Sequence, residues 1–178
     1  FDNPTAEAKI NNAKNSNSKA IFDKIIADGD AKLTEKKYAD AIKEYQKAVA
    51  MNLDNPAAEA KIKNCKQTEF DGYLKAGDDI LAQKQFDNAV KEYQKAVAMS
   101  FDNPTAEAKI KACKQTEFDG YIKAGDDLLA QKQFDNSVKE YSKALAMQFD
   151  NPTAEAKINS AKNSNTKALF DKTIAEGD

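Results

Sequence analysis

The sequence begins again before it ends. Residues 149–178 repeat residues 1–30 at 25 of 30 positions, so the chain contains a long repeat of 148 residues and the start of the next one. Two inner blocks, 53–100 and 101–148, match each other at 39 of 48 positions. Self-similarity at a period of about 20 to 50 residues is typical of solenoids, in which each unit buries its apolar face against its neighbours. The repetition therefore predicts one elongated body without a central core.

The units differ in length at one place. The first block aligns with the inner blocks only if four extra residues lie between Lys14 and Phe22, and the last segment carries the same insertion. We predict a single domain, 1–178, made of units 1–52, 53–100 and 101–148 and a partial unit 149–178 that repeats 1–30.

The charge is nearly balanced and contains no long basic stripe. The chain has 27 lysines against 29 acidic residues, and it has no Arg and no His. Nucleic acid is disfavoured as a partner, because a phosphate backbone calls for clustered positive charge. No apolar run approaches the roughly 18 to 20 residues needed to cross a bilayer, and no signal segment opens the chain. We expect a soluble protein without membrane insertion, and nothing in the sequence indicates its compartment.

Each unit predicts a long helix followed by a short one. The long segment starts with Asp-Asn-Pro, as at 102–104, and Asp or Asn as the N-cap before Pro is a strong helix start. A short polar turn follows at 131–133. From Phe134 to Leu145 the apolar residues then recur at i, i+4, i+7, i+10 and i+11, which is one stripe of an amphipathic helix. The pattern predicts antiparallel helix pairs in an all-α fold without a β-sheet.

The long segment has two interpretations. The run from Thr116 to Asp119 fits a capping box, which would start a second helix, and Gly120 weakens helical continuity by about 1 kcal/mol relative to Ala. The four-residue insertion in the outer copies is instead close to one helical turn of about 3.6 residues, which would lengthen a continuous helix. We favour one helix of about 28 residues, some 42 Å long.

Small and aromatic residues recur at the same place in each helix pair. These expected repeat-packing residues are Gly29, Tyr38, Tyr45 and Ala48, then Gly77, Phe86, Tyr93 and Ala96, then Gly125, Phe134, Tyr141 and Ala144. The pattern resembles the tetratricopeptide repeat (TPR) family, which has an aromatic, a small residue and Gly on the first helix, and Ala, an aromatic and Ala on the second. The resemblance implies a right-handed superhelix of helical hairpins. The units of 48 to 52 residues exceed the usual length of about 34.

The same resemblance implies a partner groove. TPR proteins commonly hold a peptide or a helix along a concave surface made by first-helix side chains. The corresponding positions here are Leu74, Asp78, Leu81, Ala82, Ile122, Asp126, Leu129 and Ala130. Such a groove would be apolar with acidic points, and its carboxylates would repel a ligand that ends in a carboxylate.

No catalytic or metal-binding constellation is evident. The adjacent Asp78 and Asp79 diverge by about 100° on a helix, and no nucleophile accompanies them. No segment fits the calcium loop of about twelve residues. Cys65 and Cys113 occupy the same position in successive units, where Ala13 and Ala161 stand in the outer copies, so we interpret them as small buried side chains. We therefore expect no enzyme activity, no cofactor and no metal.

Two functions remain. The first is a structural array, in which long repetitive chains or filaments have mainly themselves as partner, because near-identical units offer no variety of surfaces. Segment 149–178 breaks off within a first helix, so we expect its apolar face to be covered by more chain or by a neighbouring molecule. The second function is an adaptor that holds a peptide or helix of another protein. Replacing Asp78 and Asp126 with Lys should abolish capture of a client by the adaptor and leave an array intact.

Overall fold

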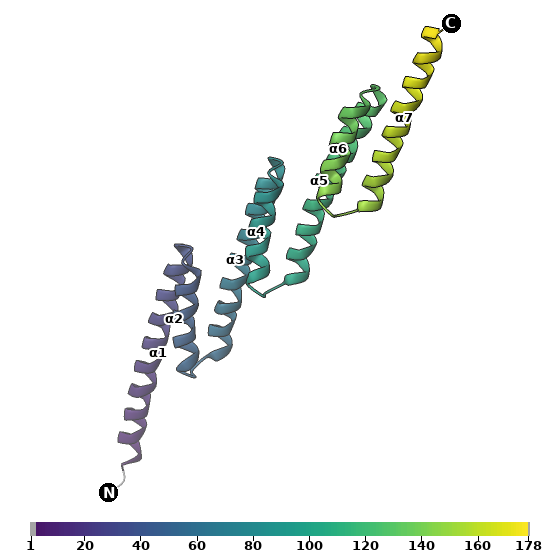
Figure 1. The fold of residues 1–178 in the computed structure, drawn as a ribbon. Helices are drawn as coiled ribbons and strands as arrows, with labels where there is room; N and C mark the ends of the chain where they lie inside the picture. Colours follow the sequence, from purple (N-terminus) through teal and green to yellow (C-terminus); the bar gives the residue numbers. More distant parts are fainter. Residues whose placement is uncertain (1–2, 178) are drawn as a thin grey trace. The chain divides into compact units, whose positions relative to one another are not determined.

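The computed structural model describes residues 3–177 and consists of long helices that alternate with short ones (Figure 1). The helices are α1 (Pro4–Thr34), α2 (Tyr38–Ala50), α3 (Asn55–Ala82), α4 (Phe86–Ala98), α5 (Asn103–Ala130), α6 (Phe134–Ala146) and α7 (Asn151–Gly177). No strand occurs among the described residues, and consecutive helices pack together within each compact unit, as α1 does with α2 and α6 does with α5 and α7. This confirms the predicted all-α helical-hairpin solenoid class.

The long helices begin where the Asp-Asn-Pro motif predicts. The Asp54 carboxylate accepts a hydrogen bond from the backbone N–H of Ala57 at 3.2 Å, and Asp150 accepts one from Thr153 at 3.3 Å. In α1 the cap is Asn3, one residue later in the motif, so Pro4 is the first helical residue. Each cap satisfies an N–H that has no partner within its helix.

Each long segment is one continuous helix, as we favoured. α3 and α5 each span 28 residues and run through the predicted capping box without a break. The Thr116 hydroxyl donates to the carbonyl of Ala112 at 2.9 Å, inside the helix, and so does not cap a new one. The four-residue insertion lies within α1, which spans 31 residues. The insertion therefore adds about one turn to a helix without interrupting it.

The turn from each long helix to its short helix places a residue other than glycine in the left-handed region. Lys36, Lys84 and Lys132 have φ of 58° between the long and the short helix of a pair. The N–H of the next residue reaches back to the end of the long helix, as from Gln133 to the carbonyl of Leu128 at 2.9 Å. This pattern is a Schellman cap, where glycine is usual.

The chain divides into two compact units, which are described separately below. The first comprises the described residues up to Lys75 together with Lys95–Asp102, and the second comprises Ala76–Gln94 and the described residues from Asn103 onward. Their limits fall inside α3 and α4, so they do not coincide with the units of the sequence repeat.

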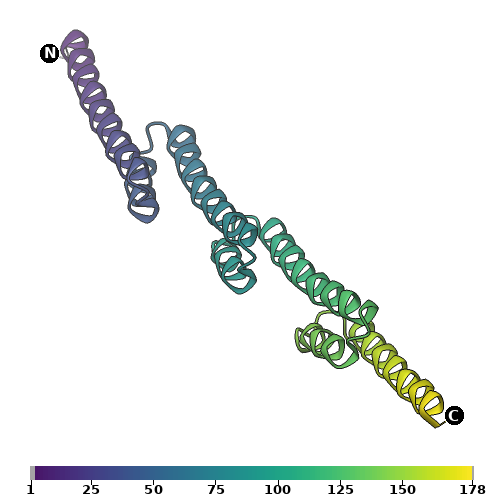
Figure 2. The ribbon, with the colours of Figure 1, turned by 90° about the horizontal axis from the view of Figure 1, so that it is seen from above.

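In the first unit α2 folds back beside the C-terminal half of α1, as Figures 1 and 2 both show. Its core consists of small clusters, each with a residue from α1 or α2 and a residue from α3. Phe22 packs with Ala48 and Ala58, and Tyr45 packs with Ala41 and Cys65. Each cluster joins neighbouring helices only, so burial here is local, as the repeat predicts.

The second unit repeats this arrangement, with α6 packed against both α5 and α7. Phe118 packs with Ala144 and Ala154, and Tyr141 packs with Ile158 and Ala161. Phe149, just before the Asp-Asn-Pro motif, also lies against Phe118, with ring centroids 5.7 Å apart and ring planes tilted by 41°. An aromatic pair of this geometry contributes about 0.5–1.5 kcal/mol beyond its buried area.

Candidate functional site

A polar contact between three helices recurs in every sequence repeat. In its last copy, the Tyr141 phenol on α6 donates a hydrogen bond to Asp126 on α5 at 2.6 Å. The Lys157 ammonium on α7 lies 2.7 and 2.8 Å from the two oxygens of the same carboxylate. One carboxylate thus holds a short helix and the next long helix together. We call this contact the Tyr–Asp–Lys clasp.

The two earlier copies have the same geometry. Their members are Tyr45, Asp30 and Lys61 in the first compact unit and Tyr93, Asp78 and Lys109 in the second. The phenol to carboxylate distance is 2.7 Å in both copies, and the ammonium lies 2.8 Å from the carboxylate. The clasp is therefore a property of the repeat.

The clasp shifts the pKa of its members in opposite directions. Burial by itself would raise the pKa of Asp126, but the hydrogen bonds from Lys157 and Tyr141 and the lysine charge outweigh it, so the pKa lies below its usual value. Asp30 behaves in the same way with Lys61 and Tyr45. Burial, and then the hydrogen bond to the carboxylate, raises the pKa of Tyr141. The clasp is therefore built for an ionised Asp and a neutral Tyr.

A glycine makes room for each clasp tyrosine. A methyl group on Gly125 would overlap the ring of Tyr141, and methyl groups on Gly29 and Gly77 would overlap Tyr45 and Tyr93 in the same way. These three tyrosines are fully buried. The aromatic ring therefore packs directly on the backbone of the neighbouring long helix, which brings its hydroxyl within reach of the Asp that follows the glycine.

Most of the predicted repeat-packing residues are buried. The buried ones are Gly29, Tyr45, Ala48, Gly77, Tyr93, Ala96, Gly125, Tyr141 and Ala144, and Tyr38, Phe86 and Phe134 are partly buried. The last three begin the short helices. Their backbones have a further role, because the Cys65 thiol lies 3.6 Å from the Tyr38 carbonyl oxygen and the Cys113 thiol lies 3.6 Å from that of Phe86.

The residues of the predicted partner groove have different surroundings in the structure. Asp78 and Asp126 are held in clasps, so their carboxylates already have cationic partners within the chain. Ile122 and Leu129 pack against the core clusters around Phe118 and Tyr141. Leu74 is partly buried, and Ala82 and Ala130 are exposed. Of the eight residues, Asp78, Leu81 and Ala82 line a cavity. The other residues that line this cavity are not among the predicted ones.

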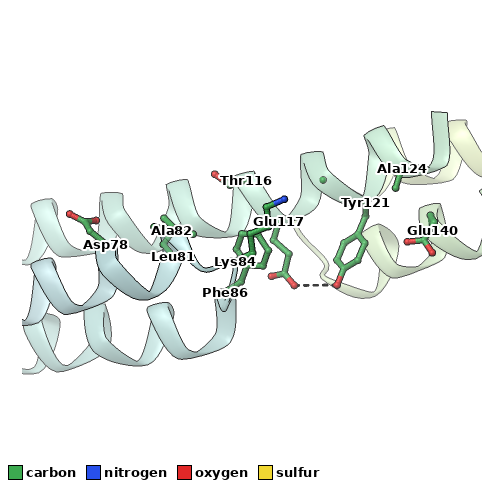
Figure 3. Close-up of a pocket in the computed structure, with 11 residues that line it drawn as sticks. Asp78, Leu81, Ala82, Lys84, Phe86, Thr116, Glu117, Tyr121, Ala124 and Glu140 are labelled. Atoms are coloured by element: carbon green, nitrogen blue, oxygen red, sulfur yellow. Dashed lines mark hydrogen bonds between the residues drawn. The ribbon is translucent and has the colours of Figure 1, made fainter. Parts of the chain in front are cut away.

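This cavity lies entirely within the second compact unit and has a volume of about 800 Å³ (Figure 3). The end of α3 and the turn into α4 form one side, whereas α5 and one residue of α6 form the other. The lining residues are Asp78, Leu81, Ala82, Lys84, Phe86, Thr116, Glu117, Gly120, Tyr121, Ala124 and Glu140. The site combines an apolar interior with charged groups.

Acidic groups outnumber basic groups around this cavity. Tyr121 donates a long hydrogen bond of 3.4 Å to Glu117, which the close-up in Figure 3 marks with a dashed line. Glu140 pairs with Lys143 at 2.7 Å, and the Lys143 ammonium lies 5.7 Å from the centre of the Tyr121 ring. Lys84 is the only basic residue among the lining residues. The cavity therefore suits a ligand that has an apolar part and a positively charged part.

A constant spacing in the sequence marks the clasp, although helical periodicity does not predict it. The lysine follows the aspartate by 31 residues in all three copies, as Lys61 follows Asp30. This spacing does not fall on one helix face, so helical periodicity could not reveal it. The lining surface of Thr116, Glu117, Gly120 and Tyr121 was likewise not predicted, because the pattern of the first three indicated a helix boundary.

The described residues offer no sign of a metal centre or of a membrane span. They contain no group of three or more His, Cys, Asp or Glu side chains placed to hold a metal ion. No helix within 3–177 is long and apolar enough to cross a membrane. Cys65 and Cys113 are buried free thiols, and burial raises the pKa of each. Neither thiol is therefore a ready nucleophile.

The near-identical helices α1 and α7 are covered on different halves. Phe22 of α1 is 7% exposed beneath α2, whereas its counterpart in α7, Phe170, is 64% exposed. In the N-terminal halves the relation is reversed, because Ile158 of α7 is 9% exposed and its counterpart Ile10 is 54% exposed. Each helix thus exposes apolar residues that its twin buries.

A scan of the sequence against models of protein families finds no match, and neither does a search against curated proteins. The surfaces described above are therefore the basis on which a function can be proposed.

Proposed function

We propose that the chain is a non-enzymatic, TPR-like interaction scaffold whose main partner is further copies of its own repeat. Its lengthened units would stack in a self-assembling or structural array. The observation that carries this proposal is the complementary burial of α1 and α7. Twin helices with one sequence pattern are covered on opposite halves, so each exposes a surface that its twin buries against another helix of the same repeat.

The repeated clasp supports the same proposal. Each aspartate binds the tyrosine of the next short helix and the lysine of the next long helix, and the geometry is the same in three copies. Contacts of this kind use only neighbouring units, so a further unit can be added without changing those already in place. A carboxylate with two fixed partners also favours one register over others.

The exposed residues on α7 indicate what a covering helix must provide. Phe170 and its neighbours Leu169 and Ile174 are each at least half exposed. In α1 the equivalent of Phe170 packs against Ala48 of α2, a small residue that leaves room for the ring. A helix like α2, with alanine opposite the phenylalanine, is therefore the cover that this face fits.

The alternative is an adaptor that binds a peptide or helix of another protein along first-helix side chains. The positions of Asp78 and Asp126 count against that surface, because both carboxylates are engaged in clasps. They also make substitution of these residues with Lys unsuitable as a test, since the change would break packing between helices whichever function is correct.

The mass of the chain in solution tests the proposal. Light scattering at micromolar concentration should give an average mass that rises with concentration well above the 19.6 kDa of one chain. Phe170→Asp should lower that mass, because it places a charge in the contact, whereas Lys162→Asp on the same helix should leave it unchanged. A constant mass of 19.6 kDa over this range would contradict self-assembly.

A further inference from the structure

We propose that the cavity beside Gly120 is a docking groove for a cationic amphipathic helix of another protein. The groove is formed by the end of α3, the turn into α4 and the exposed side of α5. It is distinct from the α7 face invoked for self-assembly, and it would operate whether or not the chain self-associates.

Gly120 is a glycine that the fold itself does not require. A methyl group at this position would meet no atom within 4 Å, whereas one at Gly125, five residues later, would overlap Tyr141. Glycine within a helix costs about 1 kcal/mol relative to alanine, so here the cost brings no packing gain within the chain. The missing side chain instead leaves helix backbone open where Gly120 lines the groove, and we call this part of the lining its floor.

The residues one helical turn before and after Gly120 also have small side chains. Thr116 and Ala124 also line the cavity, so small side chains follow each other at intervals of four along α5. Helices that meet through small residues approach to about 8 Å between their axes, the near end of the usual range. This shape favours a helix over a bulky or branched ligand.

The interior of the groove can bury an apolar anchor. Leu81, Ala82 and Phe86 line the groove from the side of α3 and α4, and Figure 3 labels all three. The volume of about 800 Å³ lies within the range of roughly 300–1,000 Å³ that is usual for ligand sites. One or two large side chains of a docked helix would replace water there.

The charges at the edge favour a cationic partner. Glu117 forms no ion pair with the described part of the chain, and its hydrogen bond from Tyr121 is long. Glu140 pairs only with Lys143 there, whereas its counterpart Glu44 is held by both Lys32 and Lys47. The cause is a substitution in the repeat, because Leu128 stands where the first copy has Lys32. Two carboxylates are thus left with capacity for lysine or arginine.

The outer copies of the repeat lack the groove floor. Lys24 of α1 and Lys172 of α7 stand at the position of Gly120. A lysine there would fill the space above the helix and repel a cationic ligand. The inner copies keep the glycine, as Gly72 and Gly120.

Two synthetic peptides test the proposal. The probe is a fluorescein-labelled helical peptide of alanine, leucine and lysine, with leucines at helical spacing on one face. Its counterpart has glutamate in place of every lysine. Fluorescence anisotropy with the full chain should show micromolar binding of the lysine peptide and at least about tenfold weaker binding of the glutamate peptide.

Matched variants locate the binding. Gly120→Leu should weaken binding of the lysine peptide about tenfold or more, because its side chain would occupy the groove. Lys172→Leu places leucine at the equivalent position of α7 and should not weaken binding of the lysine peptide. Glu117→Gln, which keeps the side-chain size, should weaken it about three- to tenfold and reduce its dependence on salt. Circular dichroism should show unchanged helix content in all three variants.

Three results would overturn the proposal. The first is absence of binding, and the second is equal binding to wild type and Gly120→Leu. The third is a fall in the solution mass of the chain itself on Gly120→Leu, since the occupant would then be a second copy. Self-assembly is judged separately from the mass of the wild-type chain, so the groove can fail while the scaffold proposal stands, and the reverse also holds.

Discussion

Lys157 and Asp126 form an ion pair of 2.7 Å that joins α7 to α5 over 31 residues of sequence. Tyr141 of α6 binds the same carboxylate, so three consecutive helices meet at one side chain. Both ion-pair partners remain more than a third exposed, so the pair by itself contributes little to stability. The effect of the ion pair is to orient the helices, because the carboxylate fixes the register in which one long helix follows the next.

The clasp hydroxyl should stabilise the fold more than the Tyr121 hydroxyl, which makes a longer hydrogen bond. We expect Tyr141→Phe to lower the free energy of unfolding by about 1.5 kcal/mol, since it removes a hydrogen bond to a charged group and leaves the ring packing intact. Tyr121→Phe is the control, because its hydroxyl makes only a 3.4 Å contact with Glu117, and we expect a loss below about 0.5 kcal/mol. Equal losses in urea unfolding would contradict the assigned role of the clasp.

Two glycines on α5 should respond to the same substitution in opposite directions. Gly125→Ala should destabilise the chain by about 1–3 kcal/mol, because the added methyl group overlaps the ring of Tyr141. Gly120→Ala should stabilise it by about 0.5–1 kcal/mol, because the new methyl group meets no atom and alanine favours the helix. Thermal melts of the two variants measure both signs, and stabilisation by Gly125→Ala would show that the helix contact is looser than described.

The left-handed turn residues offer a route to higher stability. Lys132 has φ of 58°, where glycine is free of the strain that a side chain causes. We expect Lys132→Gly to raise the free energy of unfolding by about 0.5–1 kcal/mol. Lys139→Gly, in the exposed part of α6, should lower it by about 1 kcal/mol. Chemical denaturation distinguishes the two, and a loss in both variants would argue against the Schellman cap.

Stability should fall at both ends of the pH scale, for different reasons. Hydrogen bonds from Lys32 and Lys47 lower the pKa of Glu44 from 4.5 to about 2, and the clasp lowers the pKa of Asp30 and Asp126. A group whose pKa is lower in the folded chain stabilises it above the unfolded pKa and loses that effect as pH falls. The melting temperature should therefore decline as the pH drops from about 4.5 to about 2.

At alkaline pH, stability should fall as the pH rises. Burial raises the pKa of Tyr45 and Tyr141 above 10.0 and that of Cys113 above 9.0, so the folded chain favours the protonated forms. Their contribution is fully present below the unfolded pKa and is lost as the pH rises, beginning at about pH 9 for the thiols and about pH 10 for the phenols. Melting temperatures across the pH range should therefore show a plateau with a decline on each side. A maximum confined to strongly acidic pH would contradict the clasp.

The sequence predicted those parts of the fold that depend on periodicity and caps. The Asp-Asn-Pro starts, the alternation of long and short helices and the burial of Tyr45, Tyr93 and Tyr141 all follow from local patterns. The partner of each aspartate did not follow, because Asp126 and Lys157 lie on different helices and nothing in their own helices pairs them. The cavity was missed for a related reason, since Gly120 is informative only once its empty surroundings are known.

The complementary burial of α1 and α7 is tested most directly by hydrogen–deuterium exchange at two concentrations. At low concentration the amides around Phe170 should exchange much faster than those around Phe22, because only Phe22 is covered. At a concentration where the average mass exceeds that of one chain, protection around Phe170 should rise to approach that around Phe22. Association that leaves the amides around Phe170 unprotected, or no association at all, would contradict stacking through this face.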